Sequence, residues 1–126
     1  SRSLPMPRSA YRGDWTDVDV PPKVAPGSTV RLRARFRNAS PWEWSLAVHL
    51  GAHIQGPGPA GPRREIPTRG SLGGWTPPGF LRESEIEIVA PSEPGVYRLE
   101  VDLVHECVDW FTTLGSAPRT VPLEVR

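Results

Sequence analysis

VRLRARFRN, residues 30–38, alternates apolar residues with arginine over most of its length. Successive side chains of an extended strand point to opposite faces, so the arginines share one face and the apolar residues share the other. The arginines are Arg31, Arg33, Arg35 and Arg37, and the apolar residues are Val30, Leu32, Ala34 and Phe36. The pattern predicts a strand with one face in a core. The arginine row is then either a nucleic-acid-binding stripe or the solvent-exposed face of a sheet.

A second alternating segment, ESEIEIV at 83–89, favours the solvent-exposed face. It places Glu83, Glu85 and Glu87 on one side of a strand. If the two strands are neighbours in one sheet, each of these carboxylates faces an arginine. The chain carries 15 basic and 14 acidic residues, a net charge of +1, whereas a nucleic-acid-binding domain usually has a clear basic excess. We therefore expect no nucleic-acid partner.

Short strands separated by turns account for the rest of the chain. Its 126 residues include 16 prolines and 12 glycines, which interrupt the alternating segments at short intervals. This pattern predicts an all-β fold: a two-sheet antiparallel sandwich of about seven strands, of the immunoglobulin or fibronectin-III-like kind, in which the two charged strands are neighbours. The expected strands lie at 15–24, 29–38, 44–54, 63–67, 83–89, 96–106 and 119–125.

One domain is expected over residues 15–126. Residues 1–14 are rich in proline, serine and arginine, which predicts a linker or disordered N-terminal segment of a longer protein. Strand parity then assigns the core side chains. They are Leu32, Phe36, Trp44, Leu46, Val48, Ile86, Ile88, Tyr97, Leu99, Val101 and Leu103.

Two longer stretches resemble a known family. APSEPGVYRLEVDLVHECVDWF at 90–111 has a Pro-Gly turn followed by Tyr97, a tyrosine placed as in the corner of immunoglobulin-like sandwiches. VAPGSTVRLRARFRNASPWEW at 24–44 has a second Pro-Gly turn, the alternating strand and an Asn-x-Ser followed by tryptophan. Over about residues 20–126 the chain resembles the immunoglobulin-like accessory domains of bacterial glycosyltransferases and related cell-surface-polysaccharide enzymes. These domains are loosely similar to the four-tryptophan domain of autophagy receptors.

The resemblance implies a non-catalytic accessory or interaction module. It would be the C-terminal domain of a larger bacterial, glycosyltransferase-like protein, and it would dock to the catalytic domain of its parent chain or to a partner protein. No window of the sequence has the apolar run of a membrane span or a signal peptide, which favours a cytoplasmic location without membrane insertion.

No catalytic, cofactor or metal site is expected. His105-Glu106 begins like a zinc-protease motif, but the second histidine is missing because position 109 is Asp109. His49 and His53 would lie roughly 13 Å apart on an extended strand, too far to share one metal ion. Cys107 is the only cysteine, which excludes an intramolecular disulfide, and it is expected to be a small packed residue.

Tryptophan is the residue type that points to binding, with five in the chain. Trp44 is expected in the core. Trp42, Trp75 and Trp110 are the candidate contact residues, because aromatic rings at strand ends and in loops can fill a pocket of a partner protein or stack on a sugar ring. An interaction module is the favoured function, and a carbohydrate-binding module that uses these loop tryptophans is the alternative.

Overall fold

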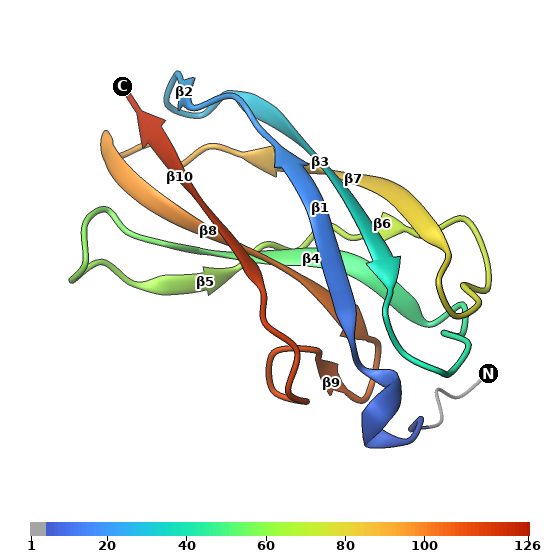
Figure 1. Ribbon diagram of the computed structural model, residues 1–126. Coiled ribbons are helices and arrows are strands. Elements are labelled where there is room, and N and C mark those ends of the chain that lie inside the picture. Colours follow the sequence, from blue (N-terminus) through green and yellow to red (C-terminus); the bar gives the residue numbers. More distant parts are fainter. Residues whose placement is uncertain (1–4) are drawn as a thin grey trace.

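The computed structural model describes residues 5–126, which form two β-sheets packed face to face (Figure 1). Its elements are a short 3-10 helix, η1 (Arg8–Ala10), and the strands β1 (Gly13–Asp19), β2 (Lys23–Val24), β3 (Thr29–Asn38), β4 (Val48–Gln55), β5 (Arg63–Glu65), β6 (Gly70–Ser71), β7 (Leu81–Val89), β8 (Gly95–His105), β9 (Asp109–Trp110) and β10 (Arg119–Val125).

The smaller sheet has the strand order β1-β3-β7, and the larger has the order β2-β10-β8-β4-β5, with β6 pairing to β4 and β9 to β8. All pairs are antiparallel except that of β10 with the two-residue β2. This is the predicted immunoglobulin-like β-sandwich. The Tyr97 hydroxyl donates a hydrogen bond to the Glu93 carbonyl oxygen at 2.7 Å, which confirms the tyrosine corner.

The core follows the predicted parity along β3, β7 and β8, where buried and exposed residues alternate over most of each strand. Trp44 is fully buried, and ten of the eleven predicted core residues are buried, as predicted. Leu46 is the exception, because its side chain is 59% exposed. The expected strand at 44–54 begins only at Val48, after a turn in which the Val48 N–H donates to the Ser45 carbonyl oxygen. That turn breaks the parity on which the prediction for Leu46 rested.

The N-terminal boundary of the domain lies earlier than predicted. Ala10 and Tyr11 are buried, and β1 begins at Gly13. Trp44 Nε1 donates to the Ala10 carbonyl oxygen at 2.6 Å, and the Tyr11 ring packs edge-on against Phe111 at 5.2 Å between centroids. The linker expected over 1–14 is therefore wrong for residues 10–14, which belong to the sandwich. Residues 1–4 of that segment lie outside the described residues.

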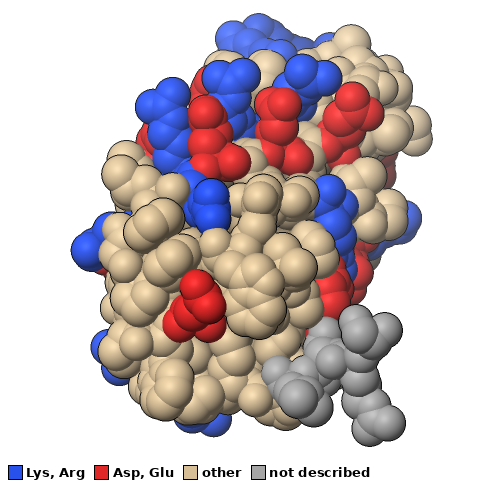
Figure 2. All heavy atoms as spheres, turned by 90° about the vertical axis from the view of Figure 1, so that its right-hand side faces the viewer, with Lys and Arg blue, Asp and Glu red and all other residues tan. Residues whose placement is uncertain are grey.

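The charged strands pair as the sequence predicted. Arg31 lies opposite Glu87, Arg33 opposite Glu85 and Arg35 opposite Glu83 in the register of β3 and β7. On the other side of β3, β1 adds an acidic row that the sequence analysis did not use: Asp14, Asp17 and Asp19 lie opposite Arg37, Arg35 and Arg33. Figure 2 shows the alternating basic and acidic side chains along one rim of the molecule. The four arginines thus lie on a solvent-exposed face that already supplies carboxylate neighbours.

Candidate functional site

Two loops at one end of the sandwich carry most of the large apolar side chains that are exposed. They are the β3–β4 loop, residues 39–47, and the β6–β7 loop, residues 72–80, which continues into the start of β7. We call their exposed residues the apolar loop surface: Trp42, Leu46, Trp75, Phe80 and Leu81. Trp42 is 46% exposed, and Trp75 and Phe80 are each 52% exposed. Figure 2 looks onto this end, and a broad area with few charged side chains lies below the charged row.

Asn38, the last residue of β3, ties the two loops together. Its side chain is fully buried, and its Nδ2 donates to the carbonyl oxygens of Trp42 at 2.8 Å and of Thr76 at 2.9 Å. Trp44 and Thr76 add a β-bridge with backbone hydrogen bonds of 2.9 and 3.0 Å. Each loop is therefore held by the other.

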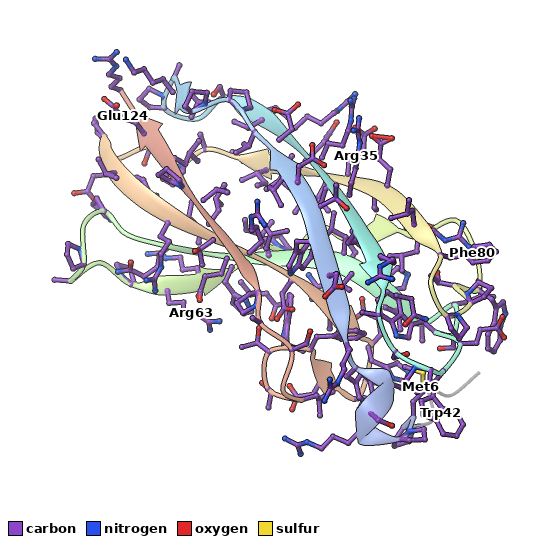
Figure 3. All side chains as sticks on the ribbon, viewed as in Figure 1. Met6, Arg35, Trp42, Arg63, Phe80 and Glu124 are labelled. Atoms are coloured by element: carbon purple, nitrogen blue, oxygen red, sulfur yellow. The ribbon has the colours of Figure 1, made fainter. Side chains whose placement is uncertain are left out.

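Further hydrogen bonds fix the loop that carries Trp42. The Asn38 Oδ1 accepts from both the backbone N–H and the hydroxyl of Ser40, at 2.9 and 2.8 Å. The Trp42 indole Nε1 donates to the Ser9 hydroxyl at 3.1 Å, so the N-terminal segment touches the apolar loop surface. In Figure 3 Trp42 lies near Met6, at the same end of the molecule as Phe80.

Arg82 of β7 positions the other two aromatic residues. Its Nη2 donates to the Trp75 carbonyl oxygen at 2.6 Å, and its Nε donates to the Thr76 hydroxyl at 3.1 Å. The guanidinium carbon lies 6.0 Å from the Phe80 ring centroid, within the range of a cation–π contact. Trp75 and Phe80 therefore project from a backbone that is already ordered.

The structure places Trp110, the third candidate tryptophan, apart from Trp42 and Trp75. Trp110 belongs to β9, which pairs with β8 of the larger sheet, and its side chain is only partly exposed. The ring lies against Gly51, where an added Cβ would come within 2.8 Å of it, and beside His53 at 4.4 Å between centroids. The guanidinium of Arg69 covers it at 4.9 Å. Trp110 thus packs on the outer face of the sheet and does not join the apolar loop surface.

Asp102 anchors the segment that carries Trp110. Its carboxylate accepts hydrogen bonds from the Thr112 hydroxyl and, at 3.1 Å, from the Thr112 N–H. It also accepts a bond from the Leu103 N–H at 2.8 Å. Burial raises the pKa of Asp102 to about 6, although these hydrogen bonds oppose the rise. The raised pKa therefore follows from the burial of a carboxyl group that holds the Thr112 segment in place.

The histidines and the cysteine have separate surroundings. His105 is buried and its Nδ1 lies 2.8 Å from the Tyr11 hydroxyl, and burial lowers its pKa. His49 lies 3.1 Å from a carboxylate oxygen of Glu106, and Cys107, expected to be packed, is exposed. Among residues 5–126, no group of three His, Cys, Asp or Glu is placed to hold a metal ion. Within the same residues, no helix is long and apolar enough to cross a membrane.

Two members of the apolar loop surface, Trp42 and Trp75, are among the candidate residues expected from the sequence. Phe80 was not among those candidates, although it follows a Pro-Pro-Gly turn that signals an exposed loop. Nor were Asn38 and Arg82, the residues that organise the surface. Their roles depend on contacts between loops that are distant in the sequence, and no local pattern reports such contacts.

Comparison with known proteins supports the fold. No protein-family model and no curated protein sequence matches the chain. Among solved structures, the C-terminal domain of wzt aligns with a TM-score of 0.64 and 12% identity over 90% of this chain and 73% of that one. The CARDB domain of a Pyrococcus furiosus protein aligns with a TM-score of 0.59 and 13% identity, over 90% of this chain and 95% of that one.

A third similar structure is a segment of a much longer protein. The Pseudomonas fluorescens alkylpurine DNA glycosylase AlkC, bound to DNA containing an abasic site analog, aligns with a TM-score of 0.65 and 13% identity. The alignment covers 91% of this chain and 30% of the glycosylase, so the chain spans less than a third of that protein. At these identities the likeness establishes the sandwich fold.

Proposed function

We propose that this domain is a non-catalytic accessory module that docks to another protein surface through the apolar loop surface. The docking partner is the catalytic domain of its parent chain or a separate partner protein. The observation that carries the proposal is the exposure of Trp42, Trp75 and Phe80 on two loops that are hydrogen-bonded to each other. Exposed apolar patches of this kind mark interaction sites on water-soluble domains.

The energetics favour a protein partner. Tryptophan is among the residues that contribute most to protein interfaces, because a large ring can be fully desolvated in a pocket. Association normally costs free energy for ordering loops and side chains. Here the Asn38 and Arg82 hydrogen bonds have already ordered the backbone, so less of that cost remains to be met on binding.

The parent protein is proposed from the sequence resemblance. The segments at 24–44 and 90–111 resemble accessory domains of bacterial glycosyltransferases, and the fold shared with the wzt C-terminal domain is compatible with such a setting. We therefore propose a glycosyltransferase-like parent. The cytoplasmic location and the absence of a nucleic-acid partner stay predictions.

Site-specific photo-crosslinking in the full-length protein tests the docking site. A photoreactive phenylalanine analogue at position 80 should crosslink to the parent catalytic domain or to a partner, and mass spectrometry should locate the crosslinked peptide. The same analogue at Val96, which is also exposed but lies at the start of β8, is the matched control. Equal crosslinking from both positions would contradict docking through the apolar loop surface.

Carbohydrate binding is the second candidate function. The half-exposed rings of Trp42 and Trp75 favour it, because indole faces stack on sugars. Trp110 no longer contributes to this candidate, since Arg69 covers its ring. Quenching of tryptophan fluorescence by oligosaccharide, lost on Trp42→Ala but kept on Trp110→Phe, would favour the carbohydrate module over protein docking.

A further inference from the structure

A groove lies between the edges of the two sheets. The groove has a volume of about 400 Å³, within the range of ligand-binding clefts. Apolar side chains line it: Ile54, Ile66, Ile88, Val89, Tyr97 and the prolines Pro57, Pro62, Pro67 and Pro91. None of these residues belongs to the apolar loop surface.

The free edge of β7 forms one side of this groove. β7 is an edge strand of the smaller sheet, in which it pairs with β3 on one side. The Ala90 N–H donates to Ser28, next to β3, whereas the Glu87 carbonyl oxygen accepts from the Thr68 hydroxyl on the opposite side. Backbone groups alternate in direction along an antiparallel strand, so Glu87 and Val89 direct their N–H groups away from β3.

Where the edge faces the groove, the Thr68 hydroxyl occupies the Glu87 carbonyl oxygen, and Val89 lies beyond that contact. Further back along β7, the segment around Gly70 and Ser71 covers the edge, and the Ser84 hydroxyl donates to the Ser71 carbonyl oxygen at 2.6 Å. At the groove, Glu87, Ile88 and Val89 all contribute to the lining, and the Val89 side chain is 71% exposed. Unpaired strand edges accept an added strand from another chain through backbone hydrogen bonds.

The charged residues of the groove indicate which kind of peptide strand would bind there. Glu87 projects from the outer face of β7. On the β3 side, Arg31 Nη2 lies 3.6 Å from the Glu87 Oε1 atom. A strand added on the other side would place its outward side chains beside Glu87 and its inward side chains over the apolar lining. The lining as a whole contains three glutamates, Glu65, Glu87 and Glu93, and one arginine, Arg64. Basic outward residues and apolar inward residues complement this site.

We propose that the groove binds an extended peptide segment of alternating basic and apolar residues, which pairs with the Glu87 N–H and with the backbone N–H and carbonyl groups of Val89. β3 already presents this alternation to the opposite edge of the same strand. The site is independent of docking through the apolar loop surface, and it gives the module a second contact with a partner protein.

Titration of the 15N-labelled domain with two blocked pentapeptides tests the proposal. The probes are acetylated and amidated Arg-Val-Arg-Val-Arg and Glu-Val-Glu-Val-Glu. The basic peptide should shift the amide signals of Glu87, Val89 and Ile66, and the acidic peptide should bind at least about tenfold more weakly. No shift at these amides at millimolar peptide, or shifts confined to the 39–47 and 72–80 loops, would overturn the proposal.

Substitutions distinguish backbone pairing with β7 from non-specific electrostatic binding of the peptide. Val89→Pro removes the outward N–H at a place where an edge strand tolerates proline, and it should weaken binding about tenfold or more. Leu81→Pro makes the same change at the other end of the β7 edge and should leave the affinity unchanged. Glu87→Lys, on the exposed face, should abolish the preference for the basic peptide, because the lining then holds two acidic and two basic side chains. Equal effects of the two proline variants on peptide affinity would overturn the assignment, as would an unchanged preference for the basic peptide in Glu87→Lys. Binding of a small apolar dye in the groove that neither peptide displaces would also overturn it.

Discussion

Arg33 of β3 lies directly opposite Glu85 of β7, and its Nε is 3.7 Å from a carboxylate oxygen of that residue. Asp19 of β1 faces the same arginine from the other side. Each arginine in the middle of the row therefore has acidic neighbours on both adjacent strands. Because these side chains are about half exposed, each pair contributes only ~0–1 kcal/mol to stability.

This arrangement predicts incomplete rescue after charge reversal. Arg33→Glu should lower the free energy of unfolding by about 0.5–1 kcal/mol, because it creates a row of like charges across three strands. Adding Glu85→Arg should restore only part of that loss, since Asp19 still faces the new glutamate. Urea unfolding at low and high salt measures both steps, and the differences should shrink at high salt. Complete rescue by the double reversal would contradict a role for β1 in the ladder.

The N-terminal segment yields a second prediction. The Met6 N–H donates to the Tyr11 hydroxyl at 2.9 Å, so the hydroxyl proton is free to point at His105 Nδ1. Tyr11→Phe should cost about 1–3 kcal/mol of stability, because a buried histidine nitrogen loses its partner. Deleting residues 1–12 should cost more, about 3–5 kcal/mol, since it also removes a buried aromatic ring. Thermal unfolding of both variants measures this, and an unchanged melting temperature after the deletion would restore the linker interpretation.

Asp102 predicts a pH dependence. Its pKa is raised from 3.8, the ordinary value for an aspartate side chain, to about 6 in the folded protein, so the folded state holds its proton more tightly than the unfolded state. The contribution of this group to stability is fully present below about pH 4 and is lost as the pH rises through 6. The change corresponds to at most about 3 kcal/mol.

Comparison with Asp102→Asn isolates this effect. Asparagine is neutral throughout, so the difference in unfolding free energy between the native protein and the variant should move against the native protein between about pH 4 and pH 6, the range from the ordinary to the shifted pKa of Asp102. Urea unfolding at several pH values in this window measures the difference. A constant difference would show that Asp102 is ionised throughout.

The sequence predicted those parts of the structure that depend on local alternation. The parity of β3 and β7 identified Leu32, Ile86 and the facing Arg and Glu rows, because strand periodicity and burial coincide there. It failed for Leu46, where a turn interrupts the strand, and for Tyr11, whose burial depends on Phe111 and His105, about a hundred residues away in the chain.

The candidate site was predictable in its residue types and not in its geometry. Exposed loop tryptophans are a recognisable signal, which led to Trp42 and Trp75. The same signal did not show that Trp110 lies apart from them, where Gly51 leaves room on the sheet for its ring and Arg69 covers it. This packing of Trp110 depends on Gly51, which lies 59 positions earlier in the chain. The alternation of residues around Gly51 does not indicate that a ring packs there.

Asn38 links the stability of the sandwich to the proposed docking surface. Asn38→Ala removes the side chain that joins the Trp42 and Thr76 carbonyl oxygens, and each of these oxygens then keeps one donor, the Ser40 hydroxyl or the Trp44 N–H. The expected loss of stability is about 2–4 kcal/mol, because the Asn38 side chain makes four hydrogen bonds of ~1 kcal/mol each. The loops should also lose order, which hydrogen exchange would detect as faster exchange of the Trp44 and Thr76 amides.

A matched surface variant completes this experiment. Trp42→Ser removes an exposed ring and leaves the Asn38 hydrogen bonds in place, since these end on the Trp42 backbone. It should change stability by less than about 0.5 kcal/mol and still abolish crosslinking from position 80 in the full-length protein. Asn38→Ala should weaken the same crosslinking through loop disorder, with all aromatic rings retained. If crosslinking is unchanged in both variants, the two loops are structural and the partner binds elsewhere on the domain.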